Sequence, residues 1–214
     1  APAPPKTATD SGFALVPFDR YPGLPELSKN FLSGAPDFFP DRPTLEAAAD
    51  RGRRLLGTPA RAPSSAFRHR GPAAAKSAED LAGGRAVAVI AGHQVGLFTG
   101  PLFTIVKAFD AIRIARQLRE RGVPAAPVFW ALTDDHDLEE VARTAKPGKD
   151  APETFLLEGA DRSNRSPVGG LPLPARVTEV LDAFAADARA PGAEEIVGAF
   201  RRRYVPGATY GDAF

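Results

Sequence analysis

Residues 90–107 read Ile-Ala-Gly-His-Gln-Val-Gly-Leu-Phe-Thr-Gly-Pro-Leu-Phe-Thr-Ile-Val-Lys, and together with residues 128–140 they decide the fold. The second stretch reads Val-Phe-Trp-Ala-Leu-Thr-Asp-Asp-His-Asp-Leu-Glu-Glu. Each begins as a short apolar run, continues as a polar loop and ends where a helix is expected to start. Two such units in succession predict parallel strands whose loops share one edge of a sheet, where α/β proteins bind ligands.

The elements between these loops form a β-α-β unit. Residues 85–91 are a continuous apolar run with β-branched residues, as expected of a buried parallel strand. From Pro101 onward apolar residues recur at the helical period until Gly122, which ends the helix. Residues 123–132 form the second strand. The predicted class is therefore α/β, with a parallel sheet and flanking helices.

The remaining chain is divided by composition. Residues 1–12 are rich in proline and alanine and are predicted to be a disordered tail. We assign residues 13–145 to the core that contains the β-α-β unit, and residues 146–214 to its continuation as a connecting helical segment. Within these ranges we expect an irregular aromatic segment over 13–43, helices over 45–56, 138–145, 175–188 and 193–204, a short turn from Ser77 to Leu81, and a weak strand over 154–157.

Composition limits the function classes. The 214 residues carry a formal net charge of +1, so global electrostatics favours neither nucleic acid nor a membrane surface. The absence of cysteine excludes disulfides, thiolate metal sites and a cysteine nucleophile. No apolar stretch approaches the roughly 20 residues of a membrane span, and we expect a cytoplasmic protein. Because the chain contains no methionine and stops where a new element begins, we expect it to be part of a longer protein.

The first loop predicts an anion-binding site. Its glycines let the backbone approach a ligand closely, and the loop leads into a helix N-terminus that favours negative charge. Lys107, about two turns into that helix, leans back toward the same end. Substrate binding is assigned to Gly92, Gln94, Gly96, Thr99, Gly100 and Lys107, and a catalytic role to His93.

The second loop concentrates ionisable groups. In an extended conformation Asp135 and Asp137 point one way and His136 the other. The face with the two carboxylates can bind an ammonium group, a pair of hydroxyls or Mg²⁺. The opposite face can supply a titratable imidazole. Catalysis is assigned to Asp135 and His136, and substrate binding to Asp137. Structural interpretations stay open: the glycines can serve the turn alone, His93 can be packed, Lys107 can lie on the surface, and Asp134 and Asp137 can cap a helix.

At these residues the chain resembles the bacillithiol biosynthesis cysteine-adding enzymes, a family of cysteine ligases. The first family block, Gly-Gln/His-Gln-x-Gly-Leu-Phe-x-Gly-Pro-Leu-Tyr-x-x-x-Lys, is similar to residues 92–107, with Phe103 in place of tyrosine. The second block, Pro-Val-Phe-Trp followed by Glu-Asp-His-Asp-x-x-Glu, is similar to residues 127–140, with Asp134 in place of glutamate. Phe38-Phe39-Pro40 also resembles an early aromatic-proline segment of the family.

The resemblance implies a Rossmann-like core and the last step of bacillithiol synthesis. In that step cysteine is joined through an amide to the amine of glucosaminyl malate. It further implies that full-length members are longer, with a C-terminal helical coiled coil that supports homodimers.

These observations lead to one favoured function and two alternatives. In the favoured one, an amide ligase, the first loop with His93 and Lys107 neutralises an anion, while Asp135 or His136 orients or deprotonates the attacking amine. The cofactor is left unknown, with ATP and Mg²⁺ as the candidates, because no Gly-x-x-x-x-Gly-Lys-Ser/Thr loop is present. The alternatives are a metal-dependent hydrolase using His93, Asp135 and His136, and a non-catalytic module that binds an anion or sugar phosphate.

Overall fold

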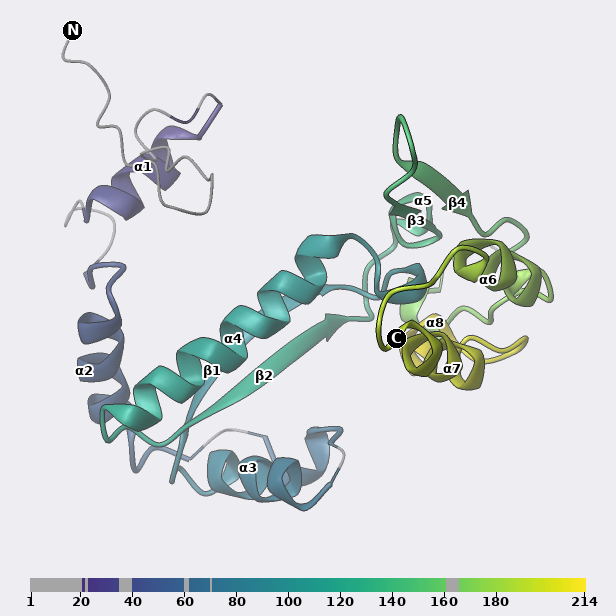
Figure 1. Ribbon diagram of the computed structural model, residues 1–214. Helices are drawn as coiled ribbons and strands as arrows, with labels where there is room; N and C mark the ends of the chain where they lie inside the picture. Colours follow the sequence, from purple (N-terminus) through teal and green to yellow (C-terminus); the bar gives the residue numbers. More distant parts are fainter. Residues whose placement is uncertain (1–20, 22, 35–39, 60–61, 70, 161–165) are drawn as a thin grey trace, which may run out of the picture.

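The computed structural model describes residues 21, 23–34, 40–59, 62–69, 71–160 and 166–214 (Figure 1). The predicted tail, residues 1–12, and the Phe38-Phe39 pair lie outside the described residues. Both loops singled out by the sequence lie inside them.

The predicted β-α-β unit is present. Strand β1 (Val87–Gln94) leads through a loop to helix α4 (Leu102–Glu120), and strand β2 (Ala125–Leu132) follows. The strands are parallel and fully in register, from the pair Val87 and Ala125 to the pair Gln94 and Leu132. Helix α4 runs along one face of the pair (Figure 1). The predicted α/β class with a parallel sheet is therefore confirmed.

Strand β1 is longer than the sequence predicted. The apolar run was expected to end at Ala91, but pairing with β2 continues through Gln94. Consequently Gly92, His93 and Gln94 belong to the strand, and the loop proper begins at Val95. The polar residues were mistaken for loop because strand pairing depends on backbone hydrogen bonds and tolerates polar side chains at the end of a sheet.

Helix α4 presents an unexpected face to solvent. An apolar stripe ordinarily faces the core, yet Leu102 is 75% exposed and Phe109 66%. The face turned inward carries Thr104, Ala111, Ala115 and Leu118 instead. Small side chains allow the helix backbone to approach the sheet closely, which explains why the alanine face is the buried one.

Four elements precede the sheet: α1 (Glu26–Ser33), α2 (Leu45–Leu55), the short 3-10 helix η2 (Ser64–Ala66) and α3 (Pro72–Ala82). The predicted cap of α2 is confirmed, because the Thr44 hydroxyl accepts a hydrogen bond from the Ala47 N–H. Helix α1 was not predicted, and α3 replaces the short turn expected from Ser77. The overlooked signal for α3 is Gly71 followed by Pro72, since proline is favoured in the first helical turn.

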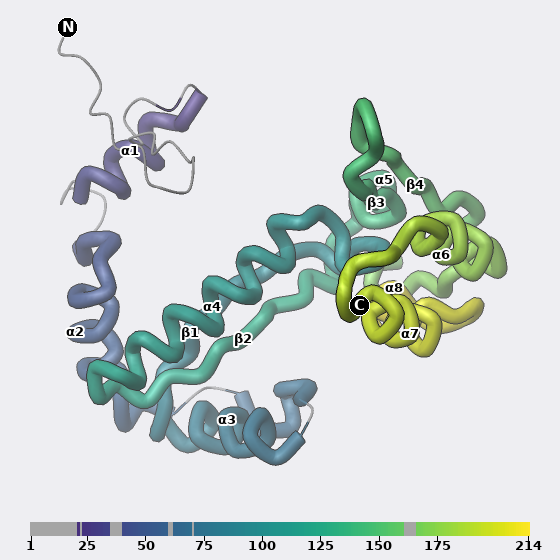
Figure 2. The backbone as a smooth tube through the Cα atoms, viewed as in Figure 1, coloured from purple at the N-terminus to yellow at the C-terminus, as the bar shows by residue number. Residues whose placement is uncertain are grey.

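The elements after β2 gather beyond the carboxyl ends of the parallel strands (Figures 1 and 2). They are α5 (Leu138–Val141), β3 (Arg143–Lys146), β4 (Glu153–Leu156), η4 (Val168–Gly170), α6 (Val177–Ala185), α7 (Ala193–Arg203) and α8 (Tyr210–Ala213). The predicted strand near 154 and the two later helices are confirmed. The helix predicted over 138–145 ends at Val141, because β3 pairs antiparallel with β4.

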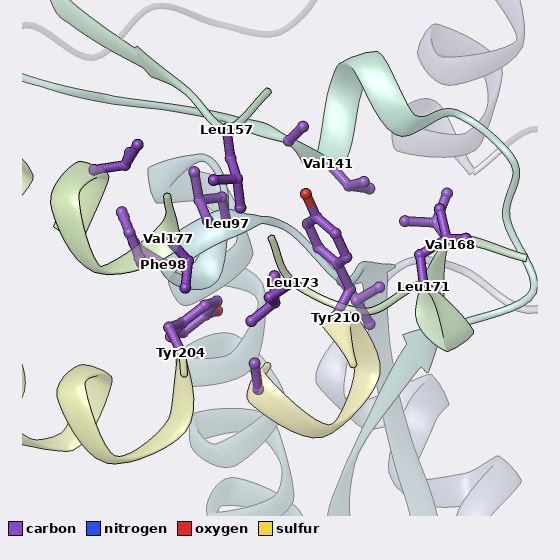
Figure 3. Packing of buried hydrophobic residues seen from close by; sticks show 14 of the residues in the cluster. Leu97, Phe98, Val141, Leu157, Val168, Leu171, Leu173, Val177, Tyr204 and Tyr210 are labelled. Atoms are coloured by element: carbon purple, nitrogen blue, oxygen red, sulfur yellow. The ribbon is translucent and has the colours of Figure 1, made fainter. Parts of the chain in front are cut away.

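Two hydrophobic clusters hold the described residues together. A small cluster packs α2 and α4 at the amino ends of the strands, and we call it the amino-end cluster; its buried members are Ala49, Ala115, Leu118, Val123 and Ala125. A larger carboxyl-edge cluster includes Leu97, Phe98, Val141, Leu157, Val177, Tyr204 and Tyr210 (Figure 3). Within the described part of the chain, no helix combines the length and apolar character needed to cross a membrane.

Candidate functional site

Asp135 organises the second loop. Its Oδ1 accepts hydrogen bonds from the backbone N–H of His136 at 2.6 Å and of Asp137 at 3.1 Å. Its backbone carbonyl accepts from the Val168 N–H at 2.7 Å, which ties the loop to η4. The Asp137 N–H, the Gln94 side chain and the His136 N–H, in that order, hold the pKa of Asp135 below its ordinary value. The carboxylate is therefore ionised and fixed in direction.

Gln94 connects the two predicted loops. Its Nε2 donates to Glu140 Oε2 at 2.9 Å, and the Gln94 side chain lies near enough to Asp135 to lower the pKa of that carboxyl group. Gln94, Asp135 and Glu140 thus form a polar trio across the carboxyl ends of β1 and β2. Glu140 was not among the predicted site residues, although it stands in the second block and ends the Asp-x-x-Glu spacing that signals a helix start.

Asp137 caps helix α5. Its Oδ1 accepts from the Glu140 N–H at 3.1 Å, which is the structural interpretation that the sequence left open. This bond also fixes the start of the helix that carries Glu140. His136 is exposed beside it, so its imidazole is accessible to a ligand.

His93 lies apart from the polar trio. Successive strand residues point to opposite faces, and His93 points toward α4 whereas Gln94 points toward Glu140. The imidazole is only 6% exposed and meets the Phe103 ring edge-on at 4.7 Å between centroids. Its Nδ1 lies 3.3 Å from the Gln94 carbonyl oxygen. The structure thus packs His93 under the first turn of α4.

Lys107 lies in the same packing layer as His93. Its Nζ donates to the Gly92 carbonyl at 3.2 Å and lies 4.6 Å from the centre of the Phe103 ring. It also lines a depression of about 170 Å³ along the outer side of β1, together with Ile90 and Asp110. The ammonium group is therefore fixed beside β1 at a partly open position.

Residues 95–100 fold back on themselves. A Cβ on Gly96 would lie 2.6 Å from the Gly100 Cα, so the loop depends on close backbone packing there. The Gly96 N–H donates to the Gln94 carbonyl at 3.0 Å, and the Gly100 N–H to the Leu97 carbonyl at 2.8 Å. These two N–H groups are used within the loop, which supports the turn interpretation of the glycines.

Gly92 has a comparable packing role in the strand. A Cβ there would lie 2.9 Å from the Trp130 carbonyl oxygen. Glycine at this position therefore lets the two strands pair closely near their carboxyl ends, directly before His93 and Gln94.

The metal-dependent alternative has no geometric support. Within the described residues no three side chains of His, Cys, Asp or Glu are grouped closely enough to hold a metal ion. His93 in particular packs against Phe103, on the face of β1 opposite the polar trio. A larger depression, about 680 Å³, lies between α6 and α7 and is lined by none of the predicted site residues.

A family model matches most of the chain. The model is described as "Bacillithiol biosynthesis BshC, N-terminal Rossmann-like domain", and it matches residues 41–214. The match includes both loops, the β-α-β unit and the elements that follow β2. It agrees with the family resemblance of the two sequence blocks.

Individual relatives carry a consistent name. A protein of Symbiobacterium thermophilum is 37% identical over 157 residues, which are 72% of this chain and 26% of the relative. One of Heliobacterium modesticaldum is 36% identical over 52% of the chain and 20% of the relative. One of Halalkalibacterium halodurans is 52% identical over 69 residues, 32% of the chain and 13% of the relative. All three are named "Putative cysteine ligase BshC", and the chain spans about a quarter or less of their length.

Proposed function

The chain belongs to the bacillithiol biosynthesis BshC family through its N-terminal Rossmann-like domain, and on that premise we propose that it takes part in amide ligation. The reaction joins the carboxyl group of cysteine to the amine of glucosaminyl malate in the cytoplasm, as the last step of bacillithiol synthesis. The structural observation that carries the proposal is the ionised Asp135 carboxylate, which is fixed beside Gln94 and Glu140 at the carboxyl ends of the strands.

Asp135 is suited to bind the amine substrate in its ammonium form. Because its pKa is lowered, the carboxylate is a weak proton acceptor but a permanent negative charge. The exposed His136 next to it carries an imidazole, the side chain that most often serves as a general base, and is suited to take up the proton that the amine must lose before it attacks. We therefore assign substrate orientation to Asp135 and proton transfer to His136.

The malate part of the acceptor carries carboxylates, and the first loop provides partners for them. Lys107 keeps N–H groups free for a ligand, because an ammonium group has three and one donates to the Gly92 carbonyl. Thr99 offers a hydroxyl in the loop between β1 and α4. His93 supports this wall by packing against Phe103 beneath Lys107.

Amide formation from a carboxylate and an amine releases water and requires prior activation of the carboxylate. ATP with Mg²⁺ can supply that activation. The described residues include neither a Walker-type loop nor a group of three metal-ligating side chains. We therefore assign no residue of this chain to the nucleotide.

The proposal is tested by condensation and by binding. The chain is incubated with cysteine, glucosaminyl malate, ATP and Mg²⁺, with the Symbiobacterium thermophilum relative in parallel, and the condensed thiol is sought by mass spectrometry. Glucosaminyl malate binding is measured by calorimetry. Asp135→Asn is expected to abolish product and binding, whereas Glu139→Gln, which removes an exposed charge on the helix that follows the loop, is expected to preserve both.

Each outcome has a defined meaning. Product or binding that is lost in Asp135→Asn and kept in Glu139→Gln supports the proposed role of the polar trio. Binding without product, when the longer relative does form product, assigns substrate recognition to this chain and catalysis to a longer polypeptide. If the folded chain forms no product and does not bind glucosaminyl malate, the proposal is contradicted.

A further inference from the structure

The loop between β1 and α4 contains an unusual backbone. Phe98, Thr99 and Gly100 all have positive φ, at 48°, 74° and 70°. Glycine tolerates this region, but for a β-branched residue such as Thr99 it is strained. Strained conformations of this kind persist only where the surrounding structure enforces them, and they cluster at functional sites.

The group that enforces the strained loop comes from the far end of the chain. The Tyr204 hydroxyl donates to the Gly96 carbonyl at 3.1 Å and accepts from the Thr99 N–H at 3.2 Å. Tyr204 directly follows α7, 105 residues after Thr99. Its ring meets the Phe98 ring edge-on at 5.0 Å, inside the carboxyl-edge cluster (Figure 3). One side chain thus fixes both sides of the loop.

The residue held most directly is the one that a ligand can reach. Val95, Gly96, Leu97, Phe98 and Gly100 are buried, whereas Thr99 is partly exposed. The buried residues pack inside the protein, and Thr99 is the residue of this loop that contacts solvent. Its direction depends on the backbone conformation that the Tyr204 hydroxyl maintains.

We propose that Tyr204 is a positioning residue, which holds Thr99 in its left-handed conformation so that the Thr99 hydroxyl can bind a carboxylate of the acceptor substrate. The proposal rests on the function proposed above, because it requires the loop between β1 and α4 to face the substrate. Tyr204 itself does not touch the ligand and acts through the Thr99 backbone.

Tyr210 provides a matched control. Both tyrosines are buried in the same cluster, at 3% and 1% exposure, and burial raises the pKa of each to about 12. Unlike the Tyr204 hydroxyl, the Tyr210 hydroxyl has no hydrogen-bond partner among the described residues. Tyr204→Phe and Tyr210→Phe therefore remove the same atom from similar surroundings, but only the first removes bonds to the loop.

The experiment measures loop order and affinity in both variants. In Tyr204→Phe we expect amide hydrogen exchange over residues 95–100 to accelerate about tenfold and the affinity for glucosaminyl malate, measured by calorimetry, to fall about tenfold. In Tyr210→Phe we expect neither value to change. Faster exchange with unchanged affinity would overturn the positioning role and leave Tyr204 as a structural residue.

A second variant keeps the test decisive if Tyr204→Phe does not fold. Thr99→Gly removes both the backbone strain and the hydroxyl, so its melting temperature should equal or exceed that of the unmodified chain while its affinity falls. Thr99→Ser, which restores a hydroxyl, should bind more tightly than Thr99→Gly. Equal affinity in these two variants would overturn the role of the hydroxyl. If the unmodified chain binds no glucosaminyl malate, the proposed function fails first, and the substrate role of Tyr204 fails with it.

Discussion

The two ends of the β1–β2 pair are built differently. At the carboxyl ends, both sequence blocks insert apolar residues into the carboxyl-edge cluster, where Phe98 packs between the rings of Phe184, Phe200 and Tyr204. Along the strands, α4 turns an alanine face inward, and the amino-end cluster is small. The apolar stripe of α4, with Leu102 and Phe109, is exposed.

This difference separates two roles within the signature blocks. Leu97, Phe98 and Leu138 lie within the two sequence blocks, and all three are buried in the carboxyl-edge cluster. Their role is therefore packing. Gln94 and Asp135 lie beside them in sequence and serve the polar trio. A long match to a family pattern therefore combines residues that pack in the hydrophobic cluster with residues that make polar contacts at the carboxyl ends of the strands.

The largest effect should come from emptying the aromatic centre of the carboxyl-edge cluster. Phe98→Ala removes a ring that is 2% exposed, and we expect a loss of about 4 kcal/mol in the free energy of unfolding. Phe109→Ala removes the same ring from the exposed stripe of α4 and should cost about 0.5 kcal/mol or less. Urea denaturation measures both changes. Equal losses would show that the exposed stripe is buried in solution and would remove the contrast between the two regions.

A smaller effect separates close packing from backbone strain. Gly96→Ala places a Cβ 2.6 Å from the Gly100 Cα, at an ordinary φ of −76°, and should cost about 2 to 3 kcal/mol by overpacking. Gly122→Ala, at the end of α4, meets nothing within 4 Å but has φ of +74°, so strain alone should cost about 1 kcal/mol. Thermal unfolding ranks the two variants. The reverse order would mean that the loop can relax and is not held by its own backbone contacts.

The sequence predicted the elements whose signals are local. The continuous apolar runs of the two strands, the helical period of α4, the Thr44 cap and the glycine at the end of α4 located the β-α-β unit and the helices. The orientation of α4 could not be predicted in this way, because the buried face is chosen by how closely alanines let the helix approach the sheet. The end of β1 was misjudged because strand pairing continued through polar residues.

The candidate site was predictable in its residue types but not in its grouping. Asp135 and Gln94 were singled out from the blocks, and the structure brings them together with Glu140. His93 was expected to share their crevice, yet strand alternation turns it toward Phe103. No local signal pointed to Tyr204, because its partners lie about a hundred residues earlier and are backbone atoms.

The smallest expected effect is the contribution of Asp135, a member of the polar trio, to the pH dependence of the free energy of unfolding. Since the pKa of Asp135 is lower in the folded chain than its ordinary value of 3.8, the folded state binds fewer protons than the unfolded state near that pH. Its contribution to stability is therefore present above about pH 4 and is lost as the pH falls through the lowered value. The side chain is partly exposed, so solvent screening should keep the contribution below about 1 kcal/mol. Urea denaturation from pH 6 to pH 3 should show a smaller loss of stability for Asp135→Asn than for the unmodified chain. If stability falls equally with pH in Asp135→Asn and in the unmodified chain, the backbone N–H bonds to Asp135 do not persist in solution. The Asp135 carboxylate is then not fixed at the carboxyl ends of the strands.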